Sequence, residues 1–286
     1  MTAESRYGAP LEMPVGRLVR AIDEPVRVGS MLWVFTDPHR GHEFAYNRWY
    51  ERDHYYGGVL LGAGTLAGSR WVATRALKDL RFPTDSTVAT PVDRGSYLAV
   101  YFIEASMIGE HFAWASEEVH KLYDAGRGFD ERTHAHTALY THQGTAYRDD
   151  DGVPVELALD HRYPGLVSIH LDRVDGVKHR EFDQWFRTEG AAALLGPDSP
   201  VAMVSSWRPI IPEGGGSDAP MDLGSGPGTP QRSAQVCFVE EDPAAVWDLF
   251  RSYASAIDDS GIATVQLAAP FIPTIVGTDT YTDQLR

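Results

Sequence analysis

The chain carries one pattern of apolar and polar positions twice. Apolar runs typical of strands and an amphipathic stretch typical of a helix recur in the second half: 31–35 at 166–170, 97–103 at 234–239, and 108–122 at 244–257. Trp49 and Trp185 lie in matching segments, 185 − 49 = 136 positions apart. Because this offset is nearly constant across four elements, we infer a duplicated module of about 135 residues.

The pattern within each module predicts the element order strand, helix, strand, long loop, strand, helix, strand. A βαββαβ unit of this kind is the ferredoxin-like arrangement, whose helices cover one face of an antiparallel sheet. Two such sheets can cover each other's open faces. The predicted fold is therefore α+β, with two tandem ferredoxin-like modules forming a pseudo-dimeric α/β barrel. We place the first module at residues 1–150 and the second, with a C-terminal arm, at 151–286, because the run at 149–154 is an acidic turn region.

Two further segments carry distinct expectations. The loop at 212–232 is rich in Gly, Ser and Pro, which predicts mobility. The arm at 270–286 has apolar pairs at 271–272 and 275–276, so we expect it to pack against the rest of the molecule.

The composition limits the classes of partner. A net charge of −15 argues against nucleic acid and anionic membranes, which require clustered Lys and Arg. No apolar run approaches the roughly 18 residues of a membrane span, and the first residues lack a signal-peptide pattern. The single cysteine, Cys237, lies in an apolar run and is expected to be a buried thiol. These features predict a cytoplasmic protein and permit a homodimer.

The segment from Trp49 to His54 is the strongest candidate for chemistry. A helix predicted at 41–56, stopped by Gly57-Gly58, places His54 at its C-terminal end, where the helix dipole would raise the pKa of the imidazole. Such a histidine can act as a general acid or base. We expect Asp53 or Glu51 to orient it. Tyr50 or Tyr140 would donate a hydrogen bond to a carbonyl oxygen of the substrate. The alternative is that His54 only caps the helix.

The same residues resemble a known family. Phe44, followed by Trp49-Tyr50 and then His54, is similar to the helix motif of EthD-like proteins of the dimeric α/β-barrel superfamily. The second copy keeps Trp185 but has Phe186 and Gly190 in place of the tyrosine and histidine. The resemblance implies an aromatic, polyketide-like or other apolar substrate and a role in catabolism or secondary metabolism.

Aromatic and polar side chains elsewhere are predicted to contact the substrate. Trp49 belongs to the motif and Tyr55 directly follows it, although packing is the better interpretation for Trp49. Alternation along 134–142 and 167–172 places further polar residues on shared strand faces, which we interpret as the lining of a cleft: Tyr140, His142, Ser168 and His170. His134 and His136, near the start of the first of these strands, are expected to be solvated.

No compact metal-binding motif is present, and we predict no metal and no cofactor. The pair His134-x-His136 is a weak signal. A haem is the less favoured alternative, and His170 or His179 would then have to bind its iron.

The leading hypothesis is an enzyme of the lyase, cyclase or isomerase type that needs no cofactor and uses His54 as general acid or base. The first alternative is a non-catalytic binder of an apolar ligand or an accessory protein. The further alternative is a haem-binding barrel enzyme.

Overall fold

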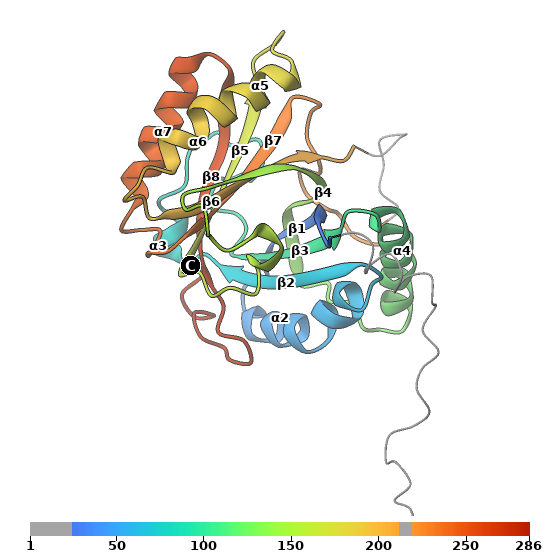
Figure 1. Ribbon diagram of the computed structural model, residues 1–286. Helices are drawn as coiled ribbons and strands as arrows, with labels where there is room; N and C mark the ends of the chain where they lie inside the picture. Colours follow the sequence, from blue (N-terminus) through green and yellow to red (C-terminus); the bar gives the residue numbers. More distant parts are fainter. Residues whose placement is uncertain (1–24, 212–218) are drawn as a thin grey trace, which may run out of the picture.

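The computed structural model describes residues 25–211 and 219–286, which form a closed antiparallel barrel of eight strands. Its strand order is β1-β3-β2-β8-β5-β7-β6-β4, and β4 pairs with β1 to close it (Figure 1). The strands of the first half are β1 (Val28–Pro38), β2 (Thr65–Val72), β3 (Tyr97–Glu104) and β4 (Arg132–Tyr147). Those of the second half are β5 (Gly165–Arg173), β6 (Val201–Pro209), β7 (Arg232–Val239) and β8 (Ala263–Pro273).

The two halves have the same strand order, β4-β1-β3-β2 in the first and β8-β5-β7-β6 in the second. The halves meet at two seams, where β4 pairs with β6 over a long register and β2 pairs with β8 only at Trp71–Pro273 and Val72–Ile272. The expected fold class, two ferredoxin-like modules in one barrel, is confirmed. The boundary at residue 150 remains a prediction, and it falls in the connection between β4 and β5.

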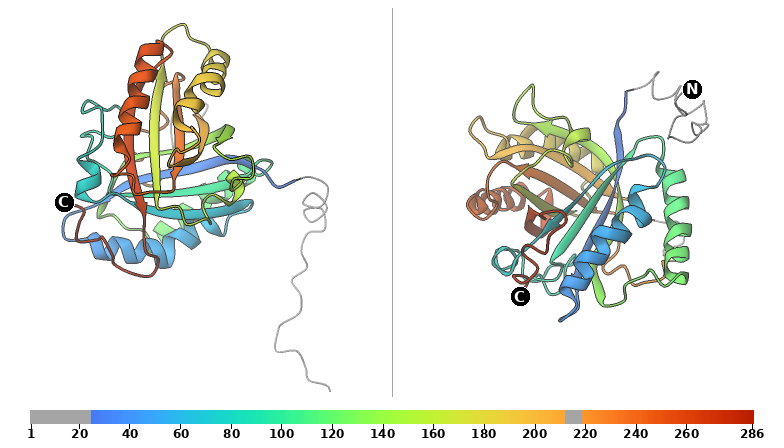
Figure 2. Two further views of the ribbon diagram at one scale, coloured as in Figure 1. Left: turned by 60° about the vertical axis from the view of Figure 1, so that its left-hand side comes forward. Right: turned by 90° about the horizontal axis from the view of Figure 1, so that it is seen from below.

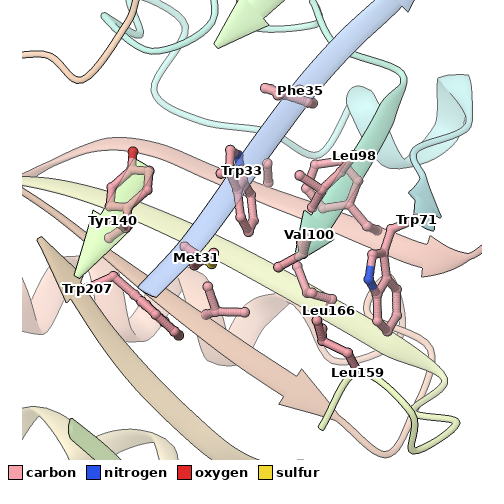
Figure 3. Close-up of a cluster of buried hydrophobic side chains, with 14 of the residues drawn as sticks. Met31, Trp33, Phe35, Trp71, Leu98, Val100, Tyr140, Leu159, Leu166 and Trp207 are labelled. Atoms are coloured by element: carbon pink, nitrogen blue, oxygen red, sulfur yellow. The ribbon is translucent and has the colours of Figure 1, made fainter. Parts of the chain in front are cut away.

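The barrel interior is a packed core. Trp33, Trp71, Trp207 and Tyr140 project from strands of both modules into the same space, together with Met31, Leu98 and Leu166 (Figure 3). All seven side chains are at most 2% exposed. Since both sheets contribute to one core, the two modules stabilise each other through apolar burial.

The helices cover the outer faces of the strands (Figure 2). On the first module these are α2 (Glu43–Trp49), the π-helix η1 (Tyr50–Leu60) and α4 (Ile108–Asp124); the short α3 (Arg75–Lys78) follows β2. On the second module they are α5 (His179–Trp185), the π-helix η3 (Phe186–Gly190), α6 (Ala191–Leu194) and α7 (Trp247–Ser260). The 3₁₀ turn η2 (Val155–Leu157) lies between the modules. No helix within 25–211 or 219–286 is long and apolar enough to cross a membrane.

The predicted end of the first helix is wrong. The chain continues through Gly57-Gly58 as a π-helix to Leu60, so His54 lies in the middle of a helical segment. Gly58 relieves crowding there, because a Cβ at this position would lie 2.8 Å from the His54 ring. π-helical turns are rare and occur often at functional sites. Both modules contain one at the same place, directly after the matching residues Trp49 and Trp185.

The C-terminal arm packs against the molecule, but only one of its two apolar pairs contributes: Phe271 is buried in β8, whereas Ile275 and Val276 are 49% and 78% exposed. Leu285 is 2% exposed, Asn47 donates a hydrogen bond to the carbonyl of Thr278, and Arg286 is paired with Glu43. The mobility predicted for 212–232 falls partly on 212–218, which lie outside the described residues. The segment that follows packs on β4, where the backbone N–H of Thr137 donates to the carbonyl of Leu223.

Candidate ligand site in the first module

A pocket of about 140 Å³ lies between η1, α4 and the outer face of β1 and β4. Its walls are mainly apolar, and residues 219–221 and Leu223 form part of its rim. Five side chains supply its nitrogen groups: His54, His111, His120, His134 and Arg132. An apolar cavity with a few convergent polar groups is typical of a small-molecule site.

His54 faces this pocket without a hydrogen-bond partner among the described residues. Its ring stacks on Trp49, with centroids 4.6 Å apart and an interplanar angle of 15°, and meets the Tyr50 ring edge-on at 5.2 Å. Gly58 leaves room for the ring on its other side. The side chain is therefore held by ring packing, and its nitrogens remain available to a ligand.

The predicted direction of the His54 pKa is wrong. Burial, with a smaller contribution from the charge of Arg132, lowers the pKa of His54 to about 3. The expected increase assumed a helix end at this residue, where carbonyl dipoles favour imidazolium. Because the helix continues and the ring is enclosed, desolvation of the charged form dominates. His54 is therefore a neutral imidazole near pH 7.

Arg132, at the start of β4, is the cation closest to this histidine cluster. The residue is 9% exposed, and its guanidinium lies 4.9 Å from the Trp49 ring centre. It donates to His134 Nε2 at 3.1 Å, to the Tyr123 hydroxyl at 2.8 Å and to the Phe129 carbonyl. None of these partners is a carboxylate.

His134 lies on the outer face of β4, and not on the face of His136 as alternation predicted. Thr36 pairs with His134 and Phe35 with His136, so Ala135 forms a bulge that shifts the pattern by one residue. Because Arg132 can only donate, His134 Nε2 must be the acceptor and its Nδ1–H donates to Thr137 Oγ1 at 2.7 Å. Burial first, and Arg132 second, lower the pKa of His134 to about 3.

His111 contributes a further nitrogen from α4. Its Nδ1 is 3.1 Å from the carbonyl oxygen of Ala63, which fixes the proton on Nδ1. Its Nε2 is buried and has no partner among the described residues. Burial lowers the pKa of His111. This arrangement, with one nitrogen held by a carbonyl and the other unprotonated, is the one found in metal-binding histidines.

Three other residues expected near His54 have structural roles. Asp53 does not orient His54, because its carboxylate is paired with Arg127 at the surface. The buried Tyr50 hydroxyl accepts a hydrogen bond from Tyr101 at 3.1 Å, and burial raises its pKa. Tyr55 points away from the pocket and lines a separate surface groove of about 790 Å³ between the modules.

The predicted polar cleft of the strands is part of the barrel interior, on the opposite face from the pocket. The Tyr140 hydroxyl lies 2.6 Å from His136 Nε2 and 3.5 Å from His170 Nδ1. His142 packs against Trp207, with ring centres 4.8 Å apart. Ser168 Oγ and His170 Nε2 are buried without a partner among the described residues. These four predicted contacts are thus not brought together with His54.

The sequence interpretation missed Arg132 and His111. His111, Ala115 and Val119 all line the pocket and recur every four residues, so the helical period could have indicated one face of α4. Arg132 carries no comparable signal, because its partners come from residues 123, 129 and 134 only after the chain folds. Within 25–211 and 219–286, no group of three or more His, Cys, Asp or Glu is arranged to hold a metal ion.

Comparison with known proteins supports the fold alone. No family model matches the chain, and no curated protein does. Similar solved structures include a dye-decolorizing peroxidase from Bacteroides thetaiotaomicron, with 8% identity, a TM-score of 0.52 and coverage of 91% of this chain and 96% of that one. A candidate chlorite dismutase has 9% identity, a TM-score of 0.51 and coverage of 90% and 100%. A haem-binding protein from Thermus thermophilus has 8% identity, a TM-score of 0.43 and coverage of 88% and 93%.

These comparisons correct the expectation of no cofactor. Solved structures with this barrel fold include a dye-decolorizing peroxidase and a candidate chlorite dismutase, so the expectation of no cofactor is withdrawn. His111 Nε2 is the nitrogen in this pocket that could bind a haem iron. The pocket of about 140 Å³, however, is smaller than the roughly 300 Å³ at which cofactor-sized sites begin. The expected donors His170 and His179 do not line it. The pocket therefore offers a donor for haem but not the space.

Proposed function

We propose that the first-module pocket binds a small, largely apolar molecule and that His54 makes a polar contact with it. The observation that carries this proposal is the His54 ring, which lines the pocket, is fixed by stacking on Trp49 and has no hydrogen-bond partner among the described residues. The His54 residue is only partly buried, so a ligand that enters the pocket can reach its nitrogens and form a hydrogen bond with them. The EthD-like resemblance of the motif supports the same location.

The protonation state favours binding over acid–base catalysis. An efficient general base has a pKa near the working pH, whereas His54 has a pKa of about 3. A neutral imidazole instead offers one donor and one acceptor to a ligand. We therefore prefer a ligand-binding role to the lyase, cyclase or isomerase hypothesis.

The pocket's volume limits the ligand's size. Dry apolar cavities of about 150 Å³ bind benzene, so the volume here suits a single aromatic ring or a short aliphatic chain. Larger polyketide-like molecules would extend beyond the described walls.

Calorimetric titration with benzamide tests the proposal. Ala115→Phe places a ring in the pocket and should abolish binding, whereas Ala113→Phe, exposed on the same helix, should not. His54→Gln should weaken binding about 3- to 10-fold, the equivalent of one hydrogen bond, and the exposed His39→Gln should have no effect. Equal binding by Ala115→Phe and the parent protein would show that the pocket is not the site.

An absorption spectrum and mass spectrometry of extracts from the freshly purified protein complete the test. We expect a small organic molecule to be released from the parent protein and to be depleted in Ala115→Phe. A Soret band would instead identify a haem and overturn the proposal. His111→Ala would then decide whether His111 binds the iron.

A further inference from the structure

Arg132 is a buried cation that has no anionic partner among residues 25–211 and 219–286. Its residue is 9% exposed, and its partners are an imidazole nitrogen, a phenol oxygen and a carbonyl oxygen. The Trp49 ring face offsets part of the cost through a cation–π contact. Buried charges in proteins are otherwise paired with an opposite charge. Of the other buried arginines, Arg70 is paired with Glu51 at 2.9 Å and Arg232 with Asp172. Arg81 donates instead to the backbone carbonyls of residues 92, 94 and 95.

The guanidinium retains hydrogen-bonding capacity. An arginine has five N–H groups, and three are assigned here, which leaves 5 − 3 = 2. Both remaining groups belong to the terminal nitrogens, one on each. Each of these two N–H groups can donate to an oxygen atom of a carboxylate or a similar anion.

The pocket wall contains no competing anion among the described residues. Its ionisable members are Arg132 and the four histidines, and no Asp, Glu or Lys lines it. The nearby Asp53 is already paired with Arg127. Burial and Arg132 keep His54 and His134 neutral, and Arg132 is the only Arg, Lys, Asp or Glu on the described walls.

We propose that the ligand of this pocket is an organic anion: a carboxylate, phenolate or enolate on a single ring or short chain, with its charged oxygen at Arg132 and its hydrocarbon part between α4 and the sheet. This inference rests on the proposed function and adds the chemical class of the ligand. His54 then donates a second hydrogen bond to the anion, because a neutral imidazole carries one N–H. Phe112, Val119 and Leu139 provide the apolar walls.

The net charge of −15 does not oppose this assignment. Charges at the surface are screened over about 8 Å at physiological ionic strength, whereas an enclosed guanidinium is screened much less. The local charge of Arg132 therefore dominates inside the pocket. The acidic surface slows the approach of an anion more than it weakens the final contact.

Isosteric pairs of probes test the charge preference. We compare benzoate with benzamide, and hexanoate with hexanamide, by calorimetry at pH 7.5. The parent protein should bind each carboxylate at least 10-fold more tightly than its amide. Arg132→Gln should abolish this difference, Arg132→Lys should retain part of it, and Arg127→Gln should retain all of it, because Arg127 is outside the pocket.

The outcomes separate the two proposals. Equal affinity for carboxylate and amide in the parent protein, or a preference that survives Arg132→Gln, would overturn the anion assignment and leave apolar binding intact. Absence of binding by all four probes would overturn both. Since Arg132→Gln could unfold, a measurement on the parent protein is added: bound 4-nitrophenol should absorb as its yellow anion at a pH where the free phenol is mainly protonated. A colourless complex would count against the anion.

Discussion

The helix-covered faces of the two modules have the same topology but different contents. In the second module, α5, η3, α6 and α7 enclose a continuous apolar cluster that includes Phe182, Trp185, Phe250 and Ile257. In the first module, the corresponding space contains a pocket with one arginine and four histidines. One face has kept the packing that stabilises the fold, and the other has exchanged part of that packing for groups that can bind a ligand.

A single exchange in the matching helices illustrates this difference. His54 corresponds to Gly190, by 190 − 54 = 136 positions, the offset that relates the two tryptophans. At Gly190 a Cβ would lie 2.8 Å from the Trp185 ring, so that ring occupies the space that an imidazole would need. In the first module, Trp49 instead stacks face-to-face on His54. The tryptophan fills space in one module and supports a histidine in the other.

The largest effect expected from this comparison is on stability. Trp185→Ala removes a core side chain that is 8% exposed, and it should lower the free energy of unfolding by about 3–5 kcal/mol. Trp49→Ala, at a partly exposed position, should cost about 1–2 kcal/mol, yet it should weaken ligand binding because His54 and Arg132 lose their support. Denaturant titration and calorimetry measure the two effects. Equal stability losses would show that the faces do not differ in this way.

The histidines should also make the first module sensitive to acid. His54 and His134 have pKa values of about 3 in the folded protein and near 6.5 when unfolded, so below pH 6.5 the unfolded chain binds more protons. Stability is therefore fully present above pH 6.5 and is lost as the pH falls towards 3, by about 1.4 kcal/mol per pH unit for each histidine. At pH 5, each of the two histidines should therefore lower the free energy of unfolding by about 2 kcal/mol relative to its value above pH 6.5.

Urea unfolding from pH 7.5 to 4.5 measures this dependence. The slope of the free energy of unfolding against pH should fall in His54→Gln by the contribution of one histidine. In the double variant with His134→Gln it should fall by the contribution of two. His39→Gln, whose imidazole is exposed, is the control. Identical slopes in the parent protein and the double variant would mean that these imidazoles are hydrated, not buried.

The fold was predictable from the sequence because it depends on patterns that repeat. The apolar runs at β1, β3, β5 and β7 are each buried over most of their length, and a duplicated βαββαβ order leaves few alternatives for closing a sheet. The end of the first helix was not predictable from its glycines. Gly57-Gly58 has the composition of a stop signal, but Gly58 is needed to make room for the His54 ring.

Of the candidate site, the sequence correctly indicated His54 but not the residues around it. His54 lies in the pocket, but its expected partners Tyr140 and His170 project into the barrel. Strand alternation failed at His134, because one bulged residue, Ala135, reverses which face every earlier position occupies. The pKa of His54 could not be read from the sequence either, since it depends on burial by α4 and β4.

The smallest predicted effect comes from adding one methyl group to a matching helical segment of each module. Gly190→Ala and Gly58→Ala both place a Cβ 2.8 Å from a ring, that of Trp185 and that of His54 respectively. Trp185 is confined by the apolar cluster, so Gly190→Ala should lower the free energy of unfolding by about 1 kcal/mol, after the gain in helix propensity is included.

His54 has no hydrogen bond to another described residue and can turn into the pocket. Gly58→Ala should therefore leave stability nearly unchanged and weaken benzamide binding. Gly109→Ala in α4, where a Cβ meets nothing within 4 Å, controls for helix propensity and should be neutral or slightly stabilising. If Gly58→Ala cost more stability than Gly190→Ala, His54 would be a core residue like Trp185, and the two faces would differ in composition but not in role.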